Sequence, residues 1–338
     1  MFIAGHSGAV VQLSSDLFFC ATEILPQAAP GILYTPDFFL SQETNPWWSA
    51  GHWEVLSRAQ VRERISGLDS VKPAMSWREP DQAYFADCFA QTQAMIASRE
   101  IEKIVPVVFA ESEFRFRPEH RGYFLRQIAH APEGAYGYGF WCGDQAMFGI
   151  TPEILFAIDD RRMSSTALAG TRPGEATDRL PLLEDAKELA EHGIVVRELE
   201  RRLSKWGVVL VEKTGVMKFP GLEHLYTRLR VELREDVDCM AVVSALHPTP
   251  AIGGYPREAS LKILKNWSRE RRRFGAPFGV NLPDGRSHCL VAIRNIQWQG
   301  ERAWLGSGCG VVAQSVLSRE WDELTRKRQS VLRILGLA

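Results

Sequence analysis

Residues 289–327 read CLVAIRNIQWQGERAWLGSGCGVVAQSVLSREWDELTRK, and this stretch decides the fold class. Two apolar runs meet at the turn Gln299-Gly300, and the glycine-rich segment 306–310 leads into a third run, VVAQS. A helical pattern follows from Ser318. Tight turns join antiparallel strands, whereas parallel strands require long crossover connections. The stretch therefore predicts an antiparallel sheet that ends in a helix.

The chain before this stretch repeats the pattern of strands joined by short turns, with helices between them. A hairpin is expected around Gly143-Asp144, and Pro106 should place a bulge or an edge in its strand. Strands are expected at 103–111, 135–142, 146–150, 154–158, 165–171 and 208–213, and the last of these is followed by a segment that ends in TRLRVEL (227–233). Helices are expected from the cap Asp81, at 118–130, from Pro181 towards Gly207, at 236–246 and at 257–268. The predicted fold class is α+β, with a mainly antiparallel sheet and helices outside it.

Residues 1–80 lack this regularity and hold short strand-like pieces between turn-rich segments such as QETNPWWSAGHW. We expect them to form a variable N-terminal layer on a core of residues 81–338. The whole chain, 1–338, is therefore predicted to be one domain, which its length allows.

The composition narrows the class of partner. The chain has 40 lysines and arginines against 41 aspartates and glutamates, a formal net charge of −1. Nucleic acid and anionic membranes are poor partners without a basic field, and no apolar run approaches the ~18 residues of a spanning helix. The six cysteines include no Cys-x-x-Cys pair, and the N-terminus lacks the basic region of a signal peptide. We expect a cytoplasmic protein that acts on a small molecule.

Two pairs of glutamates have the spacing of a metal site. Glu188 and Glu191 lie three apart on one predicted helix, as do Glu320 and Glu323 on the last helix, so each pair projects from one helix face. Each pair alone is typical of a solvated helix face. Glu323 and Lys327 also have the spacing of an ordinary surface ion pair. If the pairs meet, the four carboxylates would repel one another unless a divalent cation such as Mg²⁺ lay between them. Removing one carboxylate is then expected to stabilise the metal-free protein.

The glycine-rich segment allows three interpretations. Gly308, Gly310 and Ala313 match the G-x-G-x-x-A fingerprint of dinucleotide-binding proteins. That fingerprint must open a helix, and VVAQS is expected to continue as a strand, which disfavours a dehydrogenase. The segment is otherwise either a turn that allows close packing or a set of exposed amides that binds a carboxylate.

Four more residues could carry chemistry. Lys103 begins an apolar strand and Glu153 lies at the edge of another, where a desolvated lysine can act as a base and a buried glutamate as an acid. Each could also be a surface residue at a strand end, and His224 could be a core histidine. Arg294 lies within an apolar run, where a buried guanidinium needs an anionic partner such as a substrate carboxylate.

Seven ordered segments resemble the chorismate-utilising enzymes, which include isochorismate synthases, salicylate synthases and the large subunits of anthranilate and aminodeoxychorismate synthases. They are EKIVPVVF (102–109), GITPEILF (149–156), ALAGTRP (167–173), DAKELAEH (185–192), LHPTPAIGGYP (246–256), VAIRN (291–295) and the segment 306–327. The resemblance covers about 80–335. It implies chorismate as the substrate and two large antiparallel sheets stacked as a sandwich with helices outside.

The resemblance also implies which residues bind the metal and the substrate. The residues that match the family's Mg²⁺ site are Glu188, Glu191, Glu320 and Glu323, with Glu191 and Glu323 as the direct ligands. Substrate carboxylates would be held by Arg294, Lys327 and the amides around Gly308. Gly170 and Thr171 match the stretch that lines the ring, and His224 matches the family histidine near the leaving side chain.

Two positions and one loop discriminate among the members of the family. Anthranilate synthases carry a glutamine where Lys103 stands, and aminodeoxychorismate synthases carry a catalytic lysine where Ala169 stands. Together with HPTP these residues resemble isochorismate synthases, which serve menaquinone or siderophore biosynthesis. Lys103 would then deprotonate a water that adds at C2 of chorismate, and Glu153 would protonate the departing C4 hydroxyl. No glutamine amidotransferase subunit is expected.

Two alternatives stay open. Phe274 stands where relatives usually have a tyrosine that can hydrogen-bond the substrate. A salicylate synthase, which continues to pyruvate elimination, is the nearest alternative. A chorismate-type binding protein with weak or altered activity is the other.

Overall fold

The computed structural model describes residues 5–28, 30–41, 45–174, 181–267 and 270–338. The helices in these residues are α1 Arg58–Ser66, α2 Gln82–Ala97, α3 Pro118–Ala129, α4 Ala186–Leu203, α5 Cys239–Leu246, α6 Arg257–Asn266 and α7 Leu317–Ile334, with a 3₁₀ turn at Leu182–Glu184. The strands of the first half are β1 Ser7–Gln12, β2 Leu17–Gln27, β3 Leu33–Tyr34, β4 Trp47–Ser57, β5 Lys103–Ile104, β6 Val107–Glu113, β7 Tyr136–Cys142, β8 Gln145–Thr151, β9 Ile154–Asp159 and β10 Arg162–Pro173. Those of the second half are β11 Gly207–Val211, β12 Gly215–Phe219, β13 Leu222–Leu233, β14 Gly254–Tyr255, β15 Pro277–Asn281, β16 Ser287–Val291, β17 Asn295–Gln299 and β18 Arg302–Gly308.

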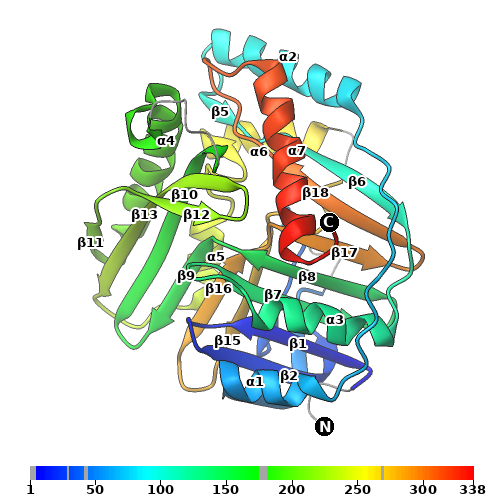
Figure 1. Ribbon diagram of the computed structural model, residues 1–338. Coiled ribbons are helices and arrows are strands. Elements are labelled where there is room, and N and C mark those ends of the chain that lie inside the picture. The colour runs from blue at the N-terminus through cyan, green and yellow to red at the C-terminus, as the bar shows by residue number, and fades with distance from the viewer. Residues whose placement is uncertain (1–4, 29, 42–44, 175–180, 268–269) are drawn as a thin grey trace.

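Apart from β5 and β14, which pair with each other, the strands form one hydrogen-bonded sheet of 16 strands, and we describe the two ends of its path as two large antiparallel sheets (Figure 1). One sheet runs β11-β13-β10-β9-β16-β15, with β12 also paired to β13, and the other runs β1-β7-β8-β17-β18-β6. The N-terminal strands β3, β4 and β2 connect β15 to β1. The predicted α+β class with antiparallel sheets is confirmed.

Successive side chains along a strand point alternately into the space between the two sheets and towards the helices outside them. Tyr138 of β7 and Phe278 of β15 face one another inside, with ring centroids 4.9 Å apart. Phe148 of β8 points the other way and packs with Phe124 of α3. On the second sheet, buried residues of β10 and β13 pack against α4 and α5. This period of two is what a strand covered on both faces requires.

The structure corrects two expectations near the C-terminus. VVAQS is not a strand, because only Val311 forms a bridge, to Ile104, before a turn leads into α7. The dinucleotide fingerprint still does not open a helix, since α7 begins at Leu317. The run 289–296 is also not one strand, because β16 ends at Val291 and β17 begins in the other sheet after Arg294.

Other boundaries differ from the sequence expectations for local reasons. The long helix begins at Ala186 rather than Pro181, because the Asp185 side chain accepts hydrogen bonds from two amides of its first turn. Pro106 separates β5 from β6, as its missing N–H requires. Residues 7–57, expected to be irregular, supply four strands of the main sheet. Helix α6 ends at Asn266, and residue 268 of its expected range lies outside the described residues.

Helix α7 contacts strands of both sheets, β8 and β18 on one side and β10 and β13 on the other (Figure 1). Its position brings the C-terminal segment to the junction of the two sheets. Among the described residues, no helix is long and apolar enough to span a membrane.

Candidate active site

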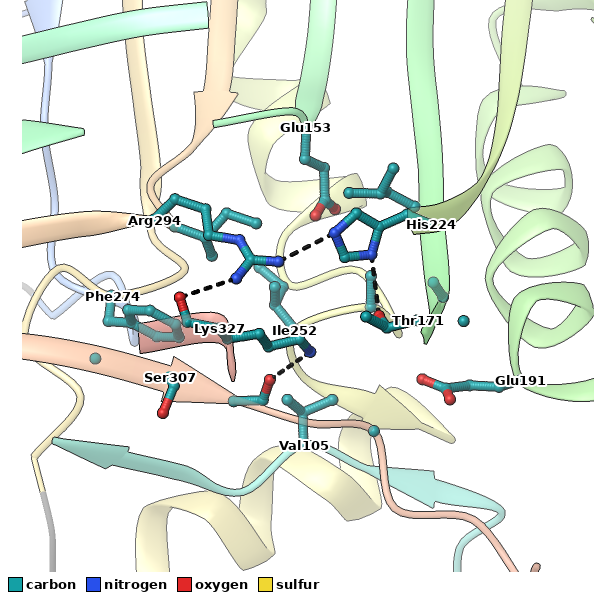
Figure 2. Close-up of a pocket in the computed structure, with 18 residues that line it drawn as sticks. Val105, Glu153, Thr171, Glu191, His224, Ile252, Phe274, Arg294, Ser307 and Lys327 are labelled. Carbon is teal, nitrogen blue, oxygen red and sulfur yellow. Dashed lines mark hydrogen bonds between the residues drawn. The ribbon is translucent and has the colours of Figure 1, made fainter. Parts of the chain in front are cut away.

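A pocket lies where strands of the two sheets, α4 and α7 converge (Figure 2). Of the residues predicted from the sequence, those that line it are Glu153, Gly170, Thr171, Glu191, His224, Arg294, Gly308 and Lys327. A wider cleft shares Thr171 with the pocket and is lined by Glu188, Glu320 and Glu323. Lys103 lies behind Glu191 with no exposed surface. The structure thus gathers all the predicted site residues in one region.

Glu153 follows the end of β8 and points into the pocket (Figure 2). Its Oε1 atom is buried without a hydrogen-bond partner among the described residues. Burial raises the pKa of this carboxyl to about 8, although the Lys103 and Lys327 ammonium groups and a hydrogen bond with Thr249 oppose the rise. Glu153 is therefore protonated at neutral pH and can donate a proton.

His224 of β13 connects two other residues of the pocket. Its Nε2 accepts a hydrogen bond from Arg294 Nη2 at 3.1 Å, so its proton lies on Nδ1 and faces Thr171 Oγ1 at 3.0 Å (Figure 2). Burial, then the Arg294 and Lys327 charges, lowers the pKa of His224 well below its ordinary value. In this arrangement His224 is a neutral ring that orients its neighbours.

Arg294 occupies the break between β16 and β17 in a left-handed conformation, with φ of 57°. Such a conformation costs about 1–3 kcal/mol for a non-glycine residue and persists where the surroundings require it. The guanidinium is buried, its Nη1 donates to Lys327 O at 3.4 Å, and burial lowers its pKa to about 10. Among the described residues no carboxylate forms a salt bridge with Arg294. Its guanidinium can therefore bind the carboxylate of a ligand.

Gly170 forms a bulge in β10 with φ of 80°, between Ala169 and Thr171. A Cβ there would lie 3.0 Å from Leu225 and 3.1 Å from the Glu188 carbonyl, so a larger residue would crowd both and would be strained at this positive φ. The bulge turns the Thr171 amide towards Glu188 Oε2, 2.8 Å away. The predicted ring-lining residues therefore also position a carboxylate of the adjoining cleft.

Lys103 and Glu191 form a buried ion pair, with 2.8 Å between Nζ and Oε1. The backbone of Gly310 passes directly over this pair. Burial opposes ionisation of Glu191, but the Lys103 and Lys187 ammonium groups outweigh it and lower the pKa of the carboxyl below its ordinary value. The lysine predicted to be a base thus forms an ion pair with the glutamate predicted to bind a metal.

We expect Gly310→Ala to destabilise the protein by about 1–3 kcal/mol, the usual cost of overpacking a filled site. The new Cβ would lie 2.6 Å from Lys103 Cε and closer still to Glu191 Oε1, and both side chains are buried. Chemical denaturation measures the loss. Gly215→Ala is the control, because its Cβ would meet nothing within 4 Å and its φ is not positive. Unchanged stability of Gly310→Ala would contradict the close approach.

The two predicted glutamate pairs do meet, on α4 and α7, but lysines lie among them. Lys187 Nζ is 2.9 Å from Glu188 Oε1, 3.3 Å from Glu320 Oε1 and 3.6 Å from Glu191 Oε2. Lys327 Nζ is 2.6 Å from Glu323 Oε1 and 2.7 Å from the Gly308 carbonyl. In the part of the chain that the structure describes, no group of three or more His, Cys, Asp or Glu side chains is arranged to hold a metal ion as it stands.

The chemistry of this acidic cluster nevertheless suits a divalent cation. Burial and the neighbouring carboxylates raise the pKa of Glu188 to about 7 and that of Glu320 to about 6. Glu320 Oε2 is buried without a hydrogen-bond partner among the described residues. Four oxygen-donor side chains with excess negative charge fit Mg²⁺, once the lysines no longer occupy them.

Sequence reasoning missed two residues at the site, Lys187 and Arg271. From the sequence, Lys187 resembles a surface lysine close to two glutamates. Its place in DAKE at the start of a helix is the one sign that it belongs to the site. Arg271 is buried and donates to the carbonyls of Ile252, at 2.7 Å, and Val105, both of which line the pocket. Backbone carbonyl partners leave no sequence signal. Phe274, singled out from the sequence, does line the pocket beside Phe109.

Comparisons with known proteins agree with these features. The family model described as "Chorismate binding enzyme" matches residues 13–336. The isochorismate synthase MenF of Haemophilus influenzae is 28% identical over 312 residues, 88% of this chain and 70% of that protein. The salicylate biosynthesis isochorismate synthase of Pseudomonas aeruginosa is 34% identical over 58% of this chain and 44% of that protein. Anthranilate synthase component 1 of Methanothermobacter marburgensis is 28% identical over 71% of this chain and 54% of that protein. This chain thus spans about half the length of most of these curated relatives.

Solved structures share the fold. A putative 2,3-dihydroxybenzoate-specific isochorismate synthase, DhbC from Bacillus anthracis, superposes with a TM-score of 0.81 at 22% identity, covering 98% of this chain and 97% of that one. MenF, the menaquinone-specific isochorismate synthase of Escherichia coli, superposes with a TM-score of 0.78 at 20% identity, covering 100% of this chain and 90% of that one. With a family match over nearly its whole length, this chain belongs to the chorismate binding enzymes.

Proposed function

We propose that this protein is a Mg²⁺-dependent isochorismate synthase, which adds water at C2 of chorismate and releases the C4 hydroxyl. One observation carries the proposal: Glu153, a protonated carboxyl, Arg294 and Glu191 line one pocket, and Lys103 lies directly behind Glu191 as its ion-pair partner. Such a pocket provides an acid, a nitrogen base and an anion-binding group for one small molecule. Its composition suits a dianionic substrate.

Substrate carboxylates would be held by Arg294 and Lys327. A guanidinium binds a carboxylate through two parallel hydrogen bonds, and Arg294 is fixed by His224 for this purpose. Lys327 is bound to Glu323 and to the Gly308 carbonyl, so it would exchange one of these partners for the substrate.

Glu153 would protonate the departing C4 hydroxyl, because it is buried, protonated and directed into the pocket. Lys103 would accept the proton from the attacking water. Because its ammonium group is paired with Glu191 here, it must leave that pair and lose a proton before it can act as a base. His224 would keep Arg294 and Thr171 in place during these steps.

Mg²⁺ would be held by Glu191 and Glu323, with Glu188 and Glu320 around them. Bound there, the ion would supply positive charge to balance a substrate carboxylate. Glu188 is kept in position by the Thr171 amide, which links the metal ligands to the wall of the pocket.

The choice of isochorismate synthase within the family rests on Lys103 and Ala169. Ala169 lines the pocket, so a lysine nucleophile is missing from the position that aminodeoxychorismate synthases use. Lys103 beside the pocket favours water as the nucleophile, and we propose that no glutamine amidotransferase partner is needed. Phe274 cannot hydrogen-bond the side chain of the substrate, which favours release of isochorismate before pyruvate is eliminated.

Product analysis tests the proposal. Purified protein incubated with chorismate and Mg²⁺ is expected to form isochorismate reversibly, with no stimulation by glutamine or ammonia. Chromatography separates the possible products. Salicylate and pyruvate in equal amounts, without isochorismate, would identify a salicylate synthase. Binding of chorismate without any product would favour the alternative of a chorismate-type binding protein. Full turnover in EDTA would contradict the metal requirement.

The pH dependence of kcat provides a separate prediction. Glu153 must be protonated to act as the acid, so kcat should fall as pH rises through about 8, the pKa of this buried carboxyl. The residual kcat of Glu153→Gln should not show this fall at high pH. A wild-type profile that stays flat to pH 9.5 would argue against Glu153 as the acid.

A further inference from the structure

Lys187 occupies an unusual place for a lysine. It is the second residue of α4, where the helix dipole disfavours a positive charge. Its ammonium group nevertheless lies among Glu188, Glu191 and Glu320, with the distances of 2.9, 3.6 and 3.3 Å given above. These carboxylates compensate for both the dipole and the partial burial of the lysine, and the pKa of Lys187 is raised above its ordinary value by them despite that burial.

The Nζ atom of Lys187 lies within the proposed metal site, beside Glu191, one of its two proposed direct ligands. Three of the four glutamates assigned to Mg²⁺ direct an oxygen at its Nζ atom, and the fourth pairs with Lys327. A cation of charge two that coordinates the same oxygens at about 2.1 Å cannot share them with an ammonium group. Either cation can offset negative charge at these oxygens, but both cannot occupy them together.

The wide cleft beside Lys187 has room for its side chain in a second position. Its side chain is 21% exposed and lines the wide cleft, whose volume is about 590 Å³. A lysine side chain can turn into such a space and remain hydrated. Lys103, the other lysine that contacts Glu191, has no exposed surface and no such alternative.

We infer that Lys187 is the resident counter-ion of the acidic cluster in the metal-free protein and competes with the divalent cation for it. This inference rests on the proposed metal site and adds a residue that sets its affinity. Lys187 keeps the glutamates together without metal, and it must swing into the cleft when the metal enters. The cost of displacing it weakens metal binding.

Calorimetric titration of Mg²⁺ into metal-free protein tests this without any assay of turnover. Lys187→Met, which keeps most of the side-chain volume without the charge, should bind Mg²⁺ on the order of tenfold more tightly than wild type, a change of about 1.4 kcal/mol. Lys187→Arg should show no such gain. Lys262→Met removes an exposed lysine on α6 and should leave the affinity unchanged.

Thermal unfolding gives a second readout. In EDTA, Lys187→Met should melt below wild type, because the carboxylates lose a counter-ion, and Mg²⁺ should restore it by a larger increment than in wild type. If Lys187→Met does not stay folded in EDTA, Lys187→Gln serves for both measurements. Equal or weaker Mg²⁺ affinity in both neutral variants, with wild type binding normally, would overturn the competition. No binding by any variant would overturn the metal site itself, and this inference with it.

Discussion

Glu191→Ala is expected to abolish turnover and to lower the stability of the metal-free protein by about 3–5 kcal/mol, the typical cost of removing one partner of a buried ion pair. The loss of turnover follows from the proposed metal site, in which Glu191 is a direct ligand. The loss of stability follows from Lys103, whose ammonium group has no exposed surface and would be left without its partner. Chromatographic assays and denaturation in EDTA measure the two effects.

Glu323→Ala provides the matched comparison. It should also abolish turnover, but its partner Lys327 is 17% exposed and keeps the Gly308 carbonyl, so the loss of stability should be smaller. The sequence alone leads to the opposite expectation for stability, since four unpaired carboxylates would repel one another. A metal-free Glu191→Ala protein more stable than wild type would restore that expectation and contradict the ion pair.

The lysines explain why the sequence could predict the members of this site but not its present state. Glu-x-x-Glu on two helices, with the resemblance to the family, was sufficient to place Glu188, Glu191, Glu320 and Glu323 together. Which cation lies among them depends on side-chain positions across α4, α7 and β5, and helical spacing holds no information about these. The same limit applies to the Lys103 pair, which joins residues 88 positions apart.

Backbone features show a similar division. The hairpin at Gly143-Asp144 and the interruption at Pro106 follow from local chemistry, and both are found. The break at Arg294 does not, because VAIRN has the composition of a strand, and its positive φ occurs where the chain passes from β16 to β17. The strand predicted at VVAQS was wrong for a related reason. Its valines are buried by neighbouring elements, but they form no strand ladder. Apolar composition reports burial there and not strand pairing.

Lys103→Ala and Glu153→Ala are each expected to lower kcat by a factor on the order of 10² to 10⁴, the usual contribution of a positioned base or acid. The loss should fall on kcat rather than KM, because neither residue is assigned to the carboxylates of the substrate, whereas Arg294→Ala should raise KM. Lys103→Ala also leaves Glu191 buried without its closest partner, so its kcat must be compared with that of Lys103→Gln, which fills the space and can hydrogen-bond the carboxylate. Both variants should melt cooperatively under assay conditions if the loss is chemical. A folded Lys103→Gln protein with wild-type kcat would remove the base from the mechanism and leave Lys103 only the task of holding Glu191.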